Sequence, residues 1–121
     1  MSNMKKVFLG GTCNNTIWRE KLIPILKIDY FNPVVDDWTL ECQKEEIKQR
    51  NKCDFCLYVI TPSMKGVYSI AEVVDDSNKR PSKTILCILE NEIPDDDGRY
   101  PTDKISFDDA ELKSLNQVAV S

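Results

Sequence analysis

The amino-acid sequence predicts an α/β protein built around a mostly parallel β-sheet. Short, nearly continuous apolar runs, clearest at residues 55–60 (FCLYVI) and 84–89 (TILCIL), are typical of strands that are covered on both faces. These runs alternate with segments whose apolar residues recur at helical spacing, and that alternation favours a parallel sheet flanked by helices. With 121 residues, of which 41% are apolar, the chain should form one domain over residues 1–121.

Four strands and four helices are expected to alternate along the chain. The strand segments are apolar runs bounded by turn-forming residues, and the helical segments carry an apolar stripe. In chain order, they are a strand at 6–9, a helix beginning near 17, a strand at 29–35, a helix at 40–50, a strand at 55–60, a helix at 69–77, a strand at 84–89 and a helix at 107–117.

Polar residues and a proline mark the expected helix ends. Residues 14–16 (NNT) offer side-chain oxygens to the first turn of the first helix, and Pro24 should kink or end that helix. Thr39 can cap the second helix, and Asp108 or Asp109 can cap the last one. The whole pattern predicts a three-layer αβα domain with a flavodoxin-like or Rossmann-like sheet of four to five strands, joined by right-handed crossovers.

Charge and composition exclude several classes of function. With a net charge of −4 and a pI near 4.8, the chain lacks the excess of positive charge that binds nucleic acid or an anionic membrane, so neither partner is expected. No apolar run approaches the roughly 20 residues that span a bilayer, and the first residues contain too few apolar side chains for a signal peptide. We therefore expect a cytoplasmic protein with reduced cysteines. The absence of histidine excludes His-ligated metals and Ser-His-Asp triads, and we expect no metal or cofactor.

Three segments should meet where a ligand would bind. In open parallel sheets, ligands bind beyond the carboxyl ends of the strands, and residues 10–15 (GGTCNN), 36–38 (DDW) and 61–72 (TPSMKGVYSIAE) all follow predicted strands. The first and third segments are glycine-containing strand-to-helix turns, whose backbone N–H groups suit anions or polar ligand edges. Gly10 and Gly11 alone are weak evidence for a binding turn, because tight turns also use glycine for purely conformational reasons.

Two acids are candidates for chemistry. Glu72 falls in the first turns of a helix that should point at the predicted crevice, where it could react with a ligand or simply favour the helix dipole. Asp54 opens the third strand and could assist catalysis or lie in solvent. The pair Cys53 and Cys56 spells C-x-x-C, but it precedes a strand, and buried packing is the expected role.

The chain resembles the nucleoside 2-deoxyribosyltransferases and the related deoxynucleotide N-glycoside hydrolases, especially the short nucleoside 2-deoxyribosyltransferase-like branch. The segments that carry the resemblance are VFLGGTCNNTIWRE, FNPVVDDW, CDFCLYVITP and GVYSIAEVVDDSNKRP. The resemblance implies that Glu72 is the nucleophile and that Asp54 assists. It also implies a homo-oligomer, because neighbouring subunits complete the site in that family. The chain departs from the family where Phe8 replaces a tyrosine and Gly66 replaces an aspartate that contacts the sugar.

The implied chemistry needs neither metal nor histidine. A carboxylate can attack the sugar carbon of an N-glycosidic bond, as in retaining glycosidases, and Asp54 could protonate the leaving base. Trp18 and Trp38 could stack on a base or pack in the core, and Asn14 could read a base edge or cap a helix. The expected substrate-binding residues are Gly10, Gly11, Thr12, Asn14, Trp18, Asp37, Trp38, Pro62, Gly66, Tyr68 and Ser69.

Three functions are compatible with these residues. The first is an N-glycoside transferase or hydrolase that acts on 2′-deoxynucleosides or their 5′-monophosphates through Glu72. The second is a module that binds a nucleotide-derived ligand without turnover, which the loss of the tyrosine hydroxyl at Phe8 and of an acid at Gly66 favours. The third is an NAD-cleaving enzyme, because such enzymes also use a glutamate against a ribosyl carbon.

Overall fold

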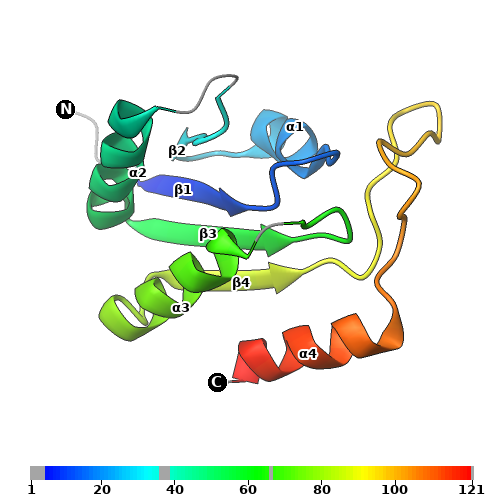
Figure 1. Cartoon of the computed structure of the whole chain (residues 1–121). Helices are drawn as coiled ribbons and strands as arrows, with labels where there is room; N and C mark the ends of the chain where they lie inside the picture. Colours follow the sequence, from blue (N-terminus) through cyan, green and yellow to red (C-terminus); the bar gives the residue numbers. More distant parts are fainter. Residues whose placement is uncertain (1–4, 36–38, 66, 121) are drawn as a thin grey trace.

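The centre of the structure is a four-stranded parallel sheet with the strand order β2-β1-β3-β4 (Figure 1). The structure is a computed structural model, and it describes residues 5–35, 39–65 and 67–120. The strands are β1 (Lys6–Gly11), β2 (Asp29–Phe31), β3 (Phe55–Ile60) and β4 (Thr84–Ile88). The predicted α/β class and the parallel pairing are confirmed, with four strands in the sheet.

Helices cover both faces of this sheet and complete the three-layer arrangement. The chain passes from β1 to β2 on one side and then returns to place β3 on the other side, so right-handed crossovers put the first helix on the opposite face from the next two. Figure 1 shows α2 and α3 on the near face of the sheet, and α1 beyond it. The helical segments are α1 (Trp18–Leu22), the 3-10 turn η1 (Ile23–Ile25), α2 (Leu40–Lys52), α3 (Tyr68–Lys79) and α4 (Asp109–Val120).

The core is divided between the two faces because side chains alternate along each strand. Phe8 of β1 packs in a buried cluster with Val73 of α3, whereas the adjacent Leu9 packs with Trp18 of α1 on the other face. Beside α3, Leu115 of α4 packs in a third cluster against the ends of β3 and β4. The pocket described below lies on the face covered by α2 and α3.

Two of the predicted helix ends in the first half of the chain are confirmed, and one is wrong. The N–H of Cys42 donates to Thr39 Oγ1 at 3.2 Å, which caps α2 as predicted. Helix α1 ends at Leu22, and Pro24 lies in the following 3-10 turn. Residues 14–16 do not cap α1: its N-cap is Ile17, and no side chain bonds to its first turn.

The second strand is shorter than predicted. It ends at Phe31 rather than at residue 35, because the Asn32 side chain accepts a hydrogen bond from Val34 N–H at 3.1 Å and Pro33 has no N–H to donate to a neighbouring strand. Residues 33–35 therefore leave the sheet and contribute to a wall of the pocket.

Candidate active site

A cavity of about 490 Å³ opens on the α2–α3 face near the carboxyl ends of β1 and β3. This is the point where the strand order reverses, and ligands of doubly wound sheets bind at such points. The volume falls within the range that holds small-molecule ligands. Its lining residues are Phe8, Gly10, Gly11, Thr12, Cys13, Asn14, Arg19, Pro33, Val34, Val35, Gln43, Glu46, Met64, Lys65, Tyr68, Ser69 and Glu72.

The floor of the cavity is the glycine-containing end of β1. Gly11 has a φ of +111°, and a Cβ there would lie 2.1 Å from the carbonyl oxygen of Val59, so the close approach of β1 to β3 requires glycine. The next residue, Thr12, is buried, and its hydroxyl accepts a hydrogen bond from Thr61 N–H at 2.9 Å. The turn after β1 is therefore fixed to the end of β3, and it presents Asn14 to the cavity.

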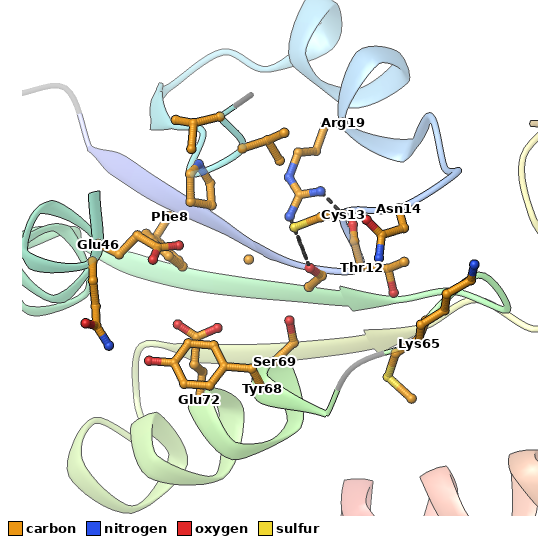
Figure 2. A pocket seen from close by; sticks show the side chains of 17 residues that line it. Phe8, Thr12, Cys13, Asn14, Arg19, Glu46, Lys65, Tyr68, Ser69 and Glu72 are labelled. Atoms are coloured by element: carbon orange, nitrogen blue, oxygen red, sulfur yellow. Dashed lines mark hydrogen bonds between the residues drawn. The ribbon is translucent and has the colours of Figure 1, made fainter. Parts of the chain in front are cut away.

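Glu72 lies on the α3 wall of the cavity and is only 8% exposed. Burial raises the pKa of Glu72 to about 7; the Arg50 guanidinium opposes this shift, and the carboxylates of Glu46 and Asp76 add to it. Arg50 Nη1 lies 3.6 Å from Glu72 Oε2. Figure 2 shows Glu72 on the α3 side of the cavity and Glu46 on the α2 side.

Next to Glu72 on α3 lies an ionic cluster centred on a fully buried acid. Asp76, one turn further along α3, is 0% exposed and accepts hydrogen bonds from Arg50, Arg80 and the hydroxyl of Tyr58. Burial and the hydrogen bond to Asp76 raise the pKa of Tyr58, so this hydroxyl stays protonated as a donor. The cluster joins α2, α3 and β3 directly beneath the cavity wall.

Seven of the thirteen residues that the sequence predicted for the site line the cavity. These are Gly10, Gly11, Thr12, Asn14, Tyr68, Ser69 and Glu72. Asp37, Trp38 and Gly66 lie outside the described residues. The remaining three, which are Trp18, Asp54 and Pro62, do not line the cavity.

Asp54 lies at the other end of the sheet. Its carboxylate accepts a hydrogen bond from Lys6 N–H at 2.9 Å and lies 4.0 Å from the Lys5 ammonium. The physical reason is that parallel strands begin at a common edge, so a residue that precedes β3 lies at the amino end of the sheet, away from the crevice. The structure therefore does not bring Asp54 and Glu72 together.

Trp18 and Pro62 are parts of the core. Trp18 is 3% exposed and packs on the α1 face with Leu9 and Val59, and its indole N–H donates to Thr12 O at 3.0 Å. That bond supports the β1 turn from behind. Pro62 is fully buried just after β3. Of the two roles that the sequence left open for Trp18, core packing is the one the structure shows.

Sequence reasoning missed the contribution of α2. Gln43 and Glu46 line the cavity, and Arg50 reaches Glu72 from the same helix. Their spacing of three and four residues places all three on one helical face, and that polar stripe was the available signal. Arg19 was also missed: it is 4% exposed and donates from Nε and Nη1 to the carbonyl oxygens of Leu9 and Thr12.

The cavity combines apolar walls with one buried carboxylate. In residues 5–35, 39–65 and 67–120, no group of three or more His, Cys, Asp or Glu side chains could hold a metal ion. In the same ranges, no helix has the length and apolar character needed to cross a membrane. The described part of the cavity presents the buried Glu72 carboxylate to a ligand, together with the side chains of Cys13, Glu46 and Lys65.

Fold and site together define an α/β protein with a ligand pocket and a buried carboxylate at the switch point of a doubly wound sheet. The chain belongs to the family described as "Nucleoside 2-deoxyribosyltransferase like", which it matches over residues 4–91. This match includes all four strands, α1, α2, α3 and the described part of the cavity, and excludes α4. No curated protein and no solved structure matches the chain.

Proposed function

We propose that the protein cleaves the N-glycosidic bond of a 2′-deoxynucleoside or its 5′-monophosphate and passes the deoxyribosyl group to another base or to water. The observation that carries this proposal is the Glu72 carboxylate, which is buried on the wall of a ligand-sized cavity at the switch point. Membership of the family supports a nucleoside-type ligand.

The reaction proceeds in two displacements at the sugar carbon C1′. In the first, a Glu72 oxygen forms a bond to C1′ while the C1′–N bond breaks, and the electron pair of that bond leaves with the base, which takes up a proton. In the second, the nitrogen of an acceptor base or the oxygen of water attacks C1′, releases the Glu72 carboxylate and loses its proton. Two inversions give net retention, as in glycosidases with a carboxylate nucleophile.

The cavity walls suit the two halves of such a substrate. Val34, Val35 and Met64 supply apolar surface for a planar base, and Asn14 and Ser69 supply polar groups for the sugar or the base edge. Tyr68 lies one turn before Glu72 on α3 and also lines the cavity, where it can border the sugar (Figure 2). Asp54 has no part in this scheme, because it does not line the cavity.

The ionisation of Glu72 determines the pH dependence of the proposed reaction. A nucleophilic carboxylate must be charged before it attacks C1′, and burial raises its pKa to about 7. The turnover of substrate should therefore rise as the pH increases through about 7. The expected homo-oligomer and cytoplasmic location remain proposals: the first has its support in the family resemblance, and the second in composition.

Glu72→Gln tests this function. The wild type, incubated with a deoxynucleoside or its 5′-monophosphate and a free base, should release or exchange the base, followed by chromatography. The variant should lose at least about 10³-fold in turnover, because the amide cannot attack C1′. Glu41→Gln is the matched control, since Glu41 is an exposed acid outside the cavity and should keep full activity.

Three results would contradict the proposal. Unchanged turnover in Glu72→Gln would remove Glu72 as the nucleophile. Calorimetric binding of a nucleotide with no product by mass spectrometry would favour a binding module. Faster cleavage of ribosyl than of deoxyribosyl substrates would favour an NAD-cleaving enzyme.

A further inference from the structure

The guanidinium of Arg50 is shared by three carboxylates of α3. Arg50 lies near the end of α2, is 8% exposed, and is the only buried residue that α2 contributes to the described core. Its nitrogens lie 3.0 Å from an oxygen of Asp75, 3.0 Å from an oxygen of Asp76 and 3.6 Å from an oxygen of Glu72. A buried arginine that spans two helices in this way is fixed at its charged end.

The geometry of these contacts leaves one nitrogen for Glu72. Arg50 Nε donates to Asp76 Oδ2 at 3.2 Å, and Nη2 donates to Asp76 Oδ1 at 3.0 Å, so the two groups form a bidentate pair. Nη2 also donates to Asp75 at 3.0 Å. The remaining nitrogen, Nη1, is the one that faces Glu72. Since the guanidinium is planar, fixing Nε and Nη2 also fixes the direction of Nη1.

Asp76 is itself held on its other sides. It accepts hydrogen bonds from the Tyr58 hydroxyl of β3 and from Arg80 of the chain that follows α3. The acid is therefore anchored to the sheet, and it anchors Arg50 in turn. Among the described residues, the one charge that favours the ionised form of Glu72 is that of Arg50, whose Nη1 lies 3.6 Å from the carboxylate.

We propose that Arg50, held by Asp76, is a positioning residue that orients the Glu72 carboxylate toward the cavity and favours its negatively charged form. The consequence for catalysis rests on the proposed function of Glu72. The effect on the carboxylate itself does not, since it follows from the contacts alone.

The charges around Glu72 act on its ionisation in opposite directions. From α2, Glu46 repels the Glu72 charge and Arg50 attracts it; from α3, Asp76 repels it. The other titratable groups near this wall include Asp75, Tyr58, Arg80 and Tyr68, and the cavity-lining Cys13, Lys65 and Arg19. Without Arg50, the burial of Glu72 and the two nearby carboxylates would all favour the neutral acid, which cannot act as a nucleophile.

The titration of Glu72 in the protein without substrate tests this inference. The side-chain carboxyl carbons are labelled with ¹³C and followed by NMR as a function of pH, and the Glu72 signal is assigned by its loss in Glu72→Gln. In Arg50→Met, the midpoint of the Glu72 titration should move upward by about 1–3 pH units, as expected when an opposite charge within about 4–6 Å is removed. Arg80→Met is the matched control, because Arg80 also binds Asp76 but does not pair with Glu72.

A second variant guards against loss of folding. Arg50→Met leaves Asp76 without one of its buried cations, whereas Arg50→Met combined with Asp76→Asn removes the charge of both partners together. The double variant should show a raised Glu72 midpoint relative to Asp76→Asn alone. If neither variant with methionine at position 50 folds, the same titration of Glu72 in Arg50→Lys tests the positioning role. Lysine keeps the positive charge but lacks the planar guanidinium that donates two parallel hydrogen bonds. Arg50→Lys should therefore raise the midpoint of the Glu72 titration by less than Arg50→Met does, and it should lower kcat.

The outcomes separate this inference from the proposed function. An unchanged Glu72 midpoint in the folded Arg50 variants, or a shift of equal size in Arg80→Met, would overturn the positioning role even if the wild type is an active enzyme. A raised midpoint specific to Arg50 would support it even if no deoxynucleoside is cleaved. In an active enzyme, the pH at which kcat/KM is half-maximal should move upward with the NMR midpoint.

Discussion

Glu72 and Asp76 are two buried carboxylates one turn apart on α3, and the structure gives them opposite surroundings. Asp76 is 0% exposed and has donors on every side, from Arg50, Arg80 and Tyr58. Glu72 is 8% exposed, faces the cavity, and has a single cation at 3.6 Å. The number and distance of the donors, rather than burial, distinguish the two acids.

This difference separates a structural carboxylate from a reactive one. A buried carboxylate that is fully hydrogen-bonded links the helices and strands that supply its donors, and its oxygens are not available to a ligand. A buried carboxylate with few donors is destabilised in its charged form, and a raised pKa next to a cavity is typical of residues that do chemistry. The same helix therefore supplies an anchor and a candidate nucleophile.

The largest effect on stability should come from the anchor. Asp76→Ala leaves the buried Arg50 and the Tyr58 hydroxyl without their acceptor, and the free energy of unfolding should fall by about 3–5 kcal/mol. Urea unfolding followed by circular dichroism measures this change. A loss below about 1 kcal/mol would mean that Asp76 is not the anchor described above.

A smaller effect, with the opposite sign, should follow from Glu72→Gln. The pKa of Glu72 is raised to about 7 in the folded protein, so the stability that this group contributes is present at acidic pH and is lost as the pH rises through about 7. The amide does not titrate. Between pH 5 and pH 8, the difference in unfolding free energy should therefore shift in favour of the variant by about 1–3 kcal/mol.

The control for this shift is internal to the experiment. Other groups titrate equally in the two proteins, so only the difference between their stability curves reports on Glu72. Parallel curves from pH 5 to pH 8 would show that Glu72 has an ordinary pKa in the folded state. That result would also remove the distinction drawn here between Glu72 and Asp76.

The smallest effect should come from the third acid of the same helix. The side chain of Asp75 is 43% exposed and pairs with Lys79 and with the outer edge of Arg50. Solvent screens such contacts, so Asp75→Asn should leave the urea midpoint close to that of the wild type. A loss comparable to that of Asp76→Ala would mean that Asp75, and not only Asp76, anchors the guanidinium.

Strong local patterns made most of the fold predictable. The run at 55–60 is β3 to the residue, because a short, continuous apolar stretch is typical of a strand that is covered on both faces. The Thr39 cap and the Asp108 cap, where Glu111 N–H donates to Asp108 Oδ1 at 2.8 Å, were predictable from local chemistry. The failed cap at residues 14–16 was not, because that turn is held by tertiary contacts, including Ser63 Oγ donating to Asn15 O at 2.9 Å.

The site was only partly predictable. The position of Glu72 on the cavity wall follows from the strand-to-helix order, since helices that follow parallel strands begin at the ligand-binding edge. The resemblance assigned Asp54 to the same site, but the topology places it at the opposite edge. Glu46 and Arg50 were missed because their distance to Glu72 depends on how α2 packs against α3, and local sequence does not encode that packing.

By itself, the sequence determined the order of strands and helices, the parallel sheet and the edge at which a ligand would bind. These features follow from apolar periodicity and chain connectivity, which are local or topological properties. Only the tertiary structure decided which carboxylate is an anchor and which is open to a ligand. That distinction depends on the few ångströms between Arg50 and each acid, and these distances are set by helices that lie far apart in the chain.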